Sequence, residues 1–238
     1  MVVKVGDCER VQSSWFAARA AALDGNEWID EGLRWIDGPD GFNLMFPPRL
    51  PVRAVARGVD RARDLGRGVV GAWLGIDVDS TALAACGFER GWSPWWMSAS
   101  LHDVPADNDP RITLSHDASG DALVRPSDAQ LLARAGALPP QAWHAAARTE
   151  SGQLAGQAWS YLSDDLCGVF DMEVRAPFQR RGLGTGLLAA VCGAARRAGG
   201  TAAMLNATPE GKALYSTCGF AHIGEGITWW NHLEKGEN

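Results

Sequence analysis

Several protein classes are excluded by what this sequence lacks. Its 22 Lys and Arg residues are outnumbered by 28 Asp and Glu, and the net charge of −6 does not suit a nucleic-acid-binding face. The longest apolar stretch, residues 187–195, is about half as long as a bilayer-spanning helix and is closed by Arg196 and Arg197. The first residues show no signal-peptide pattern. We therefore expect a cytoplasmic protein that binds neither nucleic acid nor membrane.

Cysteine and histidine are scarce and scattered. Five of each occur, with no Cys-x-x-Cys and no His-Glu-x-x-His. The cysteines are Cys8, Cys86, Cys167, Cys192 and Cys218. An odd number of widely spaced cysteines indicates reduced core residues rather than a disulfide framework or a zinc site, and we expect no metal.

Tyrosine is also rare, whereas tryptophan is abundant. The chain has 11 Trp against 7 Phe and 2 Tyr. A Trp ring can line an aromatic pocket, but for any single Trp the hydrophobic core is the more usual place. With 46% hydrophobic and 21% charged residues in 238, the composition is that of an ordinary globular protein with one large or two small domains.

The C-terminal half has clear secondary-structure punctuation. Residues 142–149, 154–162 and 167–174 predict three antiparallel strands separated by turns at 150–152 and 163–165. A helix is predicted over 183–198, with Arg196 and Arg197 in its last turn and a Gly-Gly stop after it. The strand at 201–206 should run parallel to the strand before the helix, because a helical crossover joins parallel strands. A short helix from 208 to 217 and a last strand over 220–230 complete the pattern.

The N-terminal half carries a fainter copy of the same ending. A helix closes at 62–66, a strand follows at 69–75 and a short helix at 81–85. A Cys-Gly-Phe triplet at 86–88 then leads to a Trp pair at 95–96, and the triplet at 218–220 likewise leads to a Trp pair at 229–230. This recurrence favours a duplicated fold.

The duplication predicts a division of the chain. Residues 1–101 form a degenerate copy, 102–110 a connector rich in Asp and Pro, and 111–238 the catalytic copy. The N-terminal copy has prolines at 47, 48 and 51 where the glycine loop should be. Proline removes amide donors, so we expect this half to supply packing rather than a second ligand site.

The central motif is a glycine loop between the third strand and the helix. It consists of Gln179, Arg180, Arg181, Gly182, Leu183, Gly184 and Thr185. Glycines let the backbone approach a ligand, and the amides at a helix N-terminus suit a pyrophosphate. Two other interpretations are a plain turn and a dinucleotide fingerprint, but the spacing is not G-x-G-x-x-G and the next strand ends in Asn206 rather than an acidic residue.

These residues resemble the Q/R-x-x-G-x-G/A signature of the GNAT acetyltransferase superfamily. The run from Leu205 to Phe220, LNATPEGKALYSTCGF, is similar to the ending L-x-A-T-x-x-G-x-x-L-Y-x-x-x-G-F of that superfamily. The resemblance covers about residues 142–230, and two-copy members with a degenerate N-terminal half are known. It implies an α/β fold with a mixed sheet, built as tandem GNAT-like folds with an intact acyl-CoA site in the C-terminal copy.

The resemblance also implies acetyl-CoA as the donor substrate and a primary amine as the acceptor, with direct attack in a ternary complex. The amides of Arg180 to Thr185 would hold the pyrophosphate, and the backbone of Met172 and Val174 would pair with the pantetheine arm. The implied CoA-binding positions are Met172, Val174, Gln179, Arg180, Arg181, Gly182, Leu183, Gly184, Thr185, Asn206 and Tyr215.

Tyr215 stands at the family position that protonates the departing thiolate, and a tyrosine holds its proton at neutral pH. Asp171 stands where some aminoglycoside-acetylating members carry a carboxylate, and Glu173 would share its face on a regular strand. Either is a candidate base, with His144 and Asp164 as more distant ones. Asn206 departs from the family pattern, because other members place an acidic base there. The usual proline before the loop is also displaced by one residue, to 177.

Other functions stay open at this point. The chain could be a non-catalytic acyl-CoA-binding or sensor module, a peptide or protein N-acetyltransferase, or an assembly protein with exposed Trp surfaces. A cysteine nucleophile at Cys192 or Cys218 is disfavoured, because both lie in apolar runs with no nearby histidine. We expect a small-molecule amine as acceptor. The sequence is compatible with an acyl group other than acetyl and with a homodimer.

Overall fold

The computed structural model describes residues 2–106, 108–115, 132 and 141–233. The chain forms two compact units. One, called here the 95–224 unit, comprises Met1–Val11 and Trp95–Gly224. The other, called the 12–94 unit, comprises Gln12–Pro94 and Glu225–Asn238.

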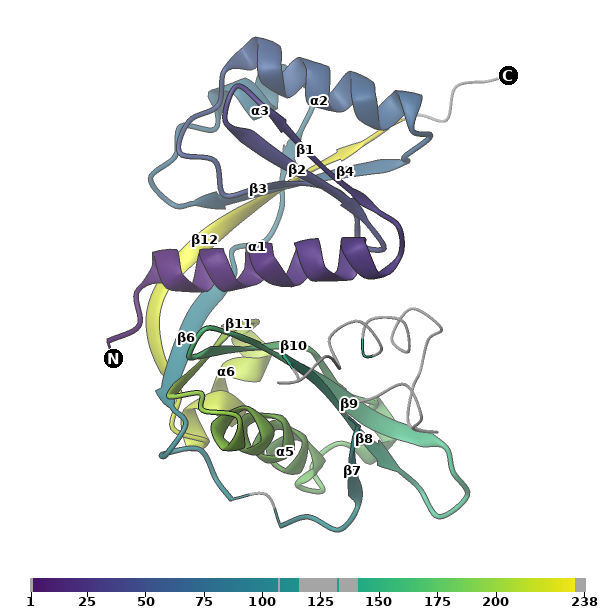
Figure 1. Ribbon diagram of the computed structural model, residues 1–238, viewed down its shortest axis with the longest axis vertical. Coiled ribbons are helices and arrows are strands. Elements are labelled where there is room, and N and C mark those ends of the chain that lie inside the picture. The colour runs from purple at the N-terminus through teal and green to yellow at the C-terminus, as the bar shows by residue number, and fades with distance from the viewer. Residues whose placement is uncertain (1, 107, 116–131, 133–140, 234–238) are drawn as a thin grey trace. The chain divides into compact units, whose positions relative to one another are not determined.

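The 95–224 unit is built on a mixed sheet (Figure 1). Its strand order is β6-β11-β10-β9-β8-β7, with bounds Trp95–Ser100 (β6), Ala202–Ala207 (β11), Leu166–Val174 (β10), Leu154–Ser163 (β9), Ala142–Arg148 (β8) and Ile112–Ser115 (β7). Strands β7 to β10 are antiparallel neighbours, and β11 is antiparallel to β6. Strands β10 and β11 are parallel, as the crossover predicted.

Two helices of this unit carry the predicted motifs. After a 3₁₀ turn over Ala176–Phe178 (η1), helix α5 (Leu183–Arg197) crosses from β10 to β11 and packs on β8, β9 and β10. Its apolar face buries Leu187, Leu188 and Val191 in the core. Helix α6 (Pro209–Thr217) begins at Thr208, whose side chain accepts a hydrogen bond from the Gly211 amide. Strand β12 (Ala221–His232) follows, and the boundary between the two units falls within it.

The 12–94 unit repeats this order of elements. After helix α1 (Val5–Ala22), which begins in the other unit, come β1 (Asn26–Asp30), β2 (Leu33–Gly38), β3 (Gly41–Met45), α2 (Val52–Asp64), β4 (Val69–Gly75), α3 (Thr81–Ala85) and the short β5 (Glu89–Arg90). Strands β1 to β3 are antiparallel, β3 and β4 are parallel, and β12 is antiparallel to β4 and β5.

The sequence patterns located the C-terminal elements to within about two residues, together with β4 and α3, but they did not reveal α1 or β1–β3. Helix α1 has no simple apolar stripe, since its buried positions include Gln12, Ser13 and Arg19. Arg19 is buried because it forms an ion pair with Asp40 at 2.9 Å and stacks on the Trp15 ring. A pattern that counts charged residues as exposed misses such a helix.

Among the described residues, no helix combines the length and the hydrophobicity that a bilayer crossing requires. Within the same residues, no cluster of three or more His, Cys, Asp or Glu side chains is arranged to hold a metal ion.

Candidate acyl-CoA site

The parallel strands β10 and β11 separate halfway along β10. Their pairing runs from Leu166, opposite Ala202, to Gly168, opposite Met204. Strand β10 continues to Val174, and its last residues, Glu173 and Val174, pair with β9. The edge of β10 that faces away from β9 at Met172 to Val174 thus lies beyond the pairing with β11, and an extended ligand could add there as a strand does.

A β-bulge lies in the open half of β10. The register with β9 shifts between Phe170 and Glu173, and Asp171 adopts a left-handed φ of 47°. The regular strand assumed for Asp171 and Glu173 is therefore wrong, because the extra residue of the bulge redirects the chain between them. Both carboxylates are nevertheless exposed, whereas Met172 and Val174 pack against the core.

The backbone of Val174 faces the open edge. The amide of Arg175 donates to Ala155 on β9 at 3.0 Å. Successive residues of a strand direct their N–H and C=O groups to opposite sides, so those of Val174 point away from β9. The Val174 carbonyl accepts from Gln179 Nε2 at 2.9 Å, which leaves the amide as the group that can pair with a ligand.

The loop between η1 and α5 uses two left-handed residues. Arg180 has φ 61°, and Gly182, the N-cap residue of α5, has φ 79°. The first amides of a helix have no intrahelical acceptor, so those of Leu183, Gly184 and Thr185 point out of the helix end. The positive end of the helix dipole lies at the same place. This geometry is that of an anion site.

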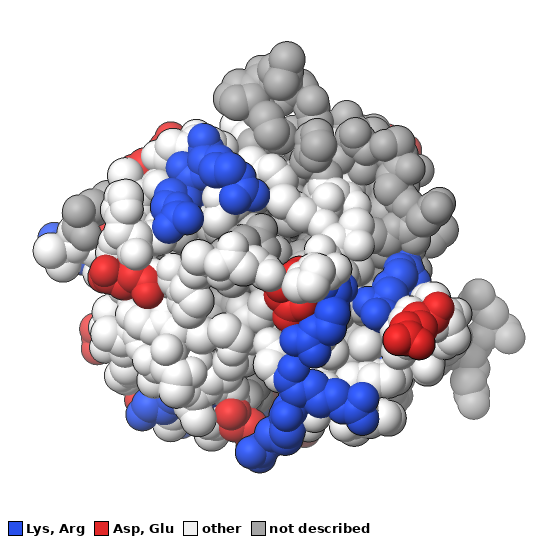
Figure 2. All heavy atoms as spheres, turned by 90° about the horizontal axis from the view of Figure 1, so that it is seen from below, with Lys and Arg blue, Asp and Glu red and all other residues white. Residues whose placement is uncertain are grey.

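Basic side chains surround this loop. Arg180 and Arg181 are exposed, and the Arg181 guanidinium lies 5.8 Å from the centre of the Phe178 ring. Figure 2 shows one face of the molecule, on which Lys and Arg side chains form a run with Asp and Glu side chains beside it. Although the whole chain is acidic, the loop itself is locally basic, which suits a phosphate-bearing ligand.

The first turn of α5 packs tightly on two sides. A methyl group added at Gly184 would lie 2.9 Å from Leu214 of α6, and one added at Gly186 would lie 2.8 Å from Asp109 Oδ2. A side chain at either position would have to displace Leu214 or Asp109. The two glycines therefore let these side chains pack closely against the first turn of α5.

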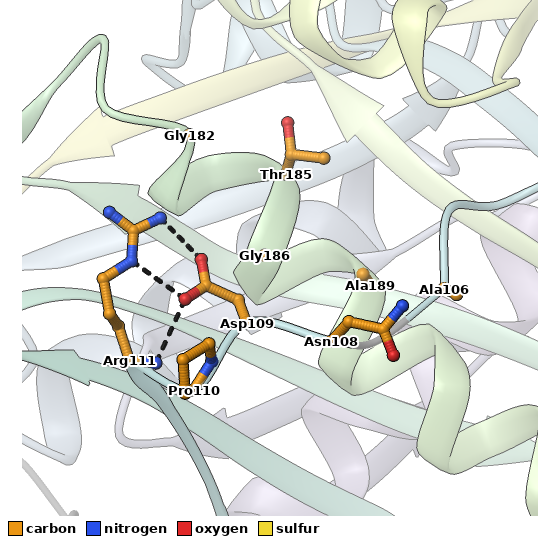
Figure 3. Close-up of a pocket in the computed structure, with 9 residues that line it drawn as sticks. All are labelled: Ala106, Asn108, Asp109, Pro110, Arg111, Gly182, Thr185, Gly186 and Ala189. Carbon is orange, nitrogen blue, oxygen red and sulfur yellow. Dashed lines mark hydrogen bonds and ion pairs between the residues drawn. The ribbon is translucent and has the colours of Figure 1, made fainter.

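The sequence patterns did not single out Asp109 and Arg111, which lie together beside the start of α5 in Figure 3. Arg111 forms two hydrogen bonds to the Asp109 carboxylate, at 2.8 and 2.6 Å, and donates through Nη1 to the Arg181 carbonyl at 3.1 Å. A hollow of about 620 Å³ opens beside them, lined by Ala106, Asn108, Asp109, Pro110, Arg111, Gly182, Thr185, Gly186 and Ala189. No motif connects residues so far apart in the chain.

Tyr215 lies on α6, half-buried against the core, with its ring 6.1 Å from that of Phe220. Burial, followed by the nearby Cys218, raises the pKa of its hydroxyl above the ordinary value. The hydroxyl therefore carries its proton at neutral pH. Asn206 lies near the end of β11, opposite Trp96 of β6.

The other candidate groups lie in unsuitable places. Cys192 and Cys218 are buried, and a hydrogen bond with Cys167, together with burial, raises the pKa of Cys192 well above the ordinary value, so its thiol is not ionised. His144 is fully buried, with its ring 4.8 Å from that of Trp159. Asp164 lies in the exposed turn between β9 and β10, where it forms an ion pair with Arg10 at 3.0 Å.

Several solved structures with this fold are named as acetyltransferases. A putative GNAT-family acetyltransferase from Novosphingobium aromaticivorans has 19% identity and a TM-score of 0.59, with 92% of this chain and 96% of that one covered. A GCN5-related N-acetyltransferase from Kribbella flavida has 16% identity and a TM-score of 0.57 over the same shares. A tandem GNAT protein from the clavulanic acid biosynthesis pathway has 16% identity and a TM-score of 0.54, over 99% of this chain and 98% of that one. At these identities the likeness shows the fold alone.

A family model matches part of the sequence. Residues 112–220 match the model described as the acetyltransferase (GNAT) family. No curated protein matches the sequence. The match covers a little under half of the chain, and it places a GNAT-family acetyltransferase domain in the 95–224 unit. Enzymes of this family take the acyl group from acetyl-CoA and act on amines.

Proposed function

We propose that this enzyme transfers an acetyl or other short acyl group from CoA to the primary amine of a small molecule, at one site in the 95–224 unit. The observation that carries the proposal is the open edge of β10 directly before the amide-rich start of α5. An acyl-CoA has a pantetheine arm with amide groups and a pyrophosphate. The edge of β10 fits the pantetheine arm, and the start of α5, which follows it in the chain, fits the pyrophosphate.

The fit assigns roles to the predicted binding residues. The outward-facing amide of Val174, and the backbone of Met172 before it, would pair with the pantetheine arm. The amides of residues 180–185 would hold the pyrophosphate, with Arg180 and Arg181 supplying positive charge. Gln179 would act indirectly, because its side-chain amide already holds the Val174 carbonyl.

Starting from an alkylammonium, the nitrogen loses two protons and the CoA sulfur gains one. The neutral amine nitrogen attacks the thioester carbonyl, a C–N bond forms, the C–S bond breaks and the CoA thiolate leaves, and the nitrogen releases its second proton to solvent as the amide forms. Tyr215 would give its proton to that sulfur, and its raised pKa keeps the proton available. The acceptor is present in water mainly as an alkylammonium with a pKa of about 10.4. It must lose a proton before it can attack, which costs about 4 kcal/mol at about pH 7.4 without a base. Asp171 or Glu173 on the exposed side of β10 would accept that proton.

The 12–94 unit would be the degenerate copy of a two-copy enzyme. Its parallel strands β3 and β4 stay paired through Met45, opposite Trp73, and the Phe46 amide still donates to the Trp73 carbonyl at 2.8 Å. No open strand edge corresponds to that of β10 in this described pair. Proline also occupies the N-cap position of α2, at Pro51, where the other unit has Gly182. A neighbour named as a tandem GNAT protein, matched over nearly the whole chain, supports this organisation.

A small amine is the acceptor that the chain's charge suits, since a net charge of −6 attracts cations. The test is thiol release from acetyl-CoA in the presence of a panel of small amines, with peptides bearing free N-termini or lysines as a second panel. We expect release that depends on an amine of the first panel, with the acetylated amine identified by mass. Release with peptides alone would make the chain a peptide acetyltransferase and contradict the proposed acceptor. No release with either panel would contradict the proposed transfer.

A further inference from the structure

We propose that Arg111, held by Asp109, is a positioning residue that orients the pyrophosphate-binding loop. The proposal rests on the proposed CoA site and adds to it a residue from the segment before β7. Its basis is the hydrogen bond from Arg111 Nη1 to the carbonyl oxygen of Arg181, at 3.1 Å.

The bonded carbonyl belongs to the peptide directly before the N-cap residue of α5. That peptide joins Arg181 to Gly182, the N-cap residue of α5, and left-handed residues lie at 180 and 182. In a trans peptide the C=O and N–H groups point in opposite directions. Because the carbonyl points to Arg111, the amide of Gly182 points away from it. Arg111 thus selects one of the two orientations in which this peptide plane could lie.

Arg111 is itself held in place. Nε and Nη2 donate to the two oxygens of Asp109, and the Asp109 carboxylate also accepts from the Arg111 backbone amide at 3.0 Å. This bidentate pairing fixes the plane of the guanidinium and directs Nη1 at the loop (Figure 3). The pKa of Asp109 is lowered by these hydrogen bonds, so the carboxylate stays charged at neutral pH.

The glycines of α5 leave room for this contact. A methyl group at Gly186 would lie 2.8 Å from Asp109 Oδ2, whereas one at Gly182 would lie 3.7 Å from Arg111 Nη2. The Asp109–Arg111 pair therefore lies directly against the first turn of α5. Since two of its nitrogens are bonded to Asp109 and the third to a carbonyl, Arg111 is better placed to orient the loop than to bind phosphate itself.

The test compares two donors that differ in the pyrophosphate. Acetyl-CoA needs the loop, whereas S-acetylpantetheine carries the same thioester and arm without the phosphates. We expect Arg111→Ala to raise KM for acetyl-CoA and Kd for CoA roughly 3- to 10-fold, as the loss of one hydrogen bond would, with kcat within about twofold. With S-acetylpantetheine, kcat/KM should stay within about twofold of wild type. Arg111→Lys should give an intermediate loss, because an ammonium cannot bond the carboxylate and the carbonyl in the same planar geometry.

Arg197→Ala is the matched control, since it removes an exposed arginine from the opposite end of α5. It should leave kcat and KM unchanged with both donors. Equal losses with both donors, unchanged CoA affinity in Arg111→Ala, or the same loss in Arg197→Ala would each overturn the proposal. A wild-type chain that binds no CoA would instead contradict the proposed function, and with it this inference. Thermal unfolding of each variant shows that it is folded.

Discussion

Tyr215 is the residue on which the proposed leaving-group chemistry depends. Its hydroxyl should act only as the C–S bond breaks, so Tyr215→Phe should lower kcat about 10²-fold or more and leave the Kd for CoA within about twofold. The raised pKa also predicts that this step keeps its proton donor at pH values where an ordinary tyrosine begins to lose its proton. Steady-state kinetics and a CoA titration measure the two effects. An unchanged kcat would mean that water supplies the proton and that Tyr215 only packs.

Asp171 and Glu173 can be separated by their dependence on pH. If Asp171 accepts the amine proton, Asp171→Asn should lower kcat/KM for an amine of high pKa by roughly 10²–10⁴-fold at neutral pH. The loss should shrink as pH rises, because free amine then forms without a base, and it should be smaller for an amine of lower pKa. Glu173→Gln is the comparison variant, and only the true base should show a defect that high pH rescues.

Two other results would contradict the base assignment. A loss of equal size at every pH would indicate that the carboxylate binds a cationic acceptor rather than takes its proton. Full activity in both variants would leave another group or a chain of waters as the proton acceptor.

The sequence indicated those candidate site residues that belong to a continuous motif. The spacing from Gln179 to Thr185 and the position of Tyr215 are sufficient to place them on the loop and on α6. The bulge at Asp171 was not predictable, because nothing in the residues of β10 shows where its register with β9 shifts. Arg111 was missed for a similar reason, since its bond to Arg181 joins positions that are distant in the chain and share no pattern.

The start of α5 is the element whose backbone geometry the account depends on. Gly182 has a φ of 79°, and the space beside it would admit a methyl group with 3.7 Å to the nearest atom. The cost of Gly182→Ala therefore comes from the left-handed backbone, about 1–2 kcal/mol, rather than from a collision. We expect weaker CoA binding in Gly182→Ala and none detectable in Gly182→Val, because a β-branched residue is disfavoured further at this φ. Calorimetric titration with CoA measures both.

Gly199, after the C-terminal end of α5, provides the control for backbone strain. It has a φ of 99° with no atom within 4 Å of an added methyl group. Gly199→Ala should therefore lower the thermal stability much as Gly182→Ala does, and leave the Kd for CoA unchanged. A full-affinity Gly182→Val variant would contradict the assignment of the loop.

Elements with a regular hydrophobic periodicity or clear turn residues were predictable. Elements whose buried positions include polar or charged residues were not. The three strands β8 to β10, helix α5 and strand β11 lie where the sequence placed them. Strands β1 to β3 were not anticipated, because charged residues such as Asp37 are buried there in ion pairs. The separation of β10 from β11 is likewise a property of tertiary pairing, which no residue pattern in either strand indicates.

The whole molecule consists of two units whose boundaries do not follow the two halves of the sequence. Strand β6, from the N-terminal half, pairs with β11, and the last part of β12, from the C-terminal half, pairs with β4. Each unit is thus completed by a strand from the other half of the chain. The division into a degenerate copy (1–101), a connector (102–110) and a catalytic copy (111–238) stays a prediction about the repeats.

The number of CoA molecules bound per chain tests the central claim most directly. An open strand edge and an amide-rich helix start occur together in the 95–224 unit, whereas in the 12–94 unit β3 and β4 stay paired and proline precedes α2. Calorimetric titration of the full chain with CoA should therefore give about one CoA per chain, lost in Gly182→Val. Two CoA molecules per chain would show that the 12–94 unit also binds the donor, and no binding would contradict an acyl-CoA site at the start of α5.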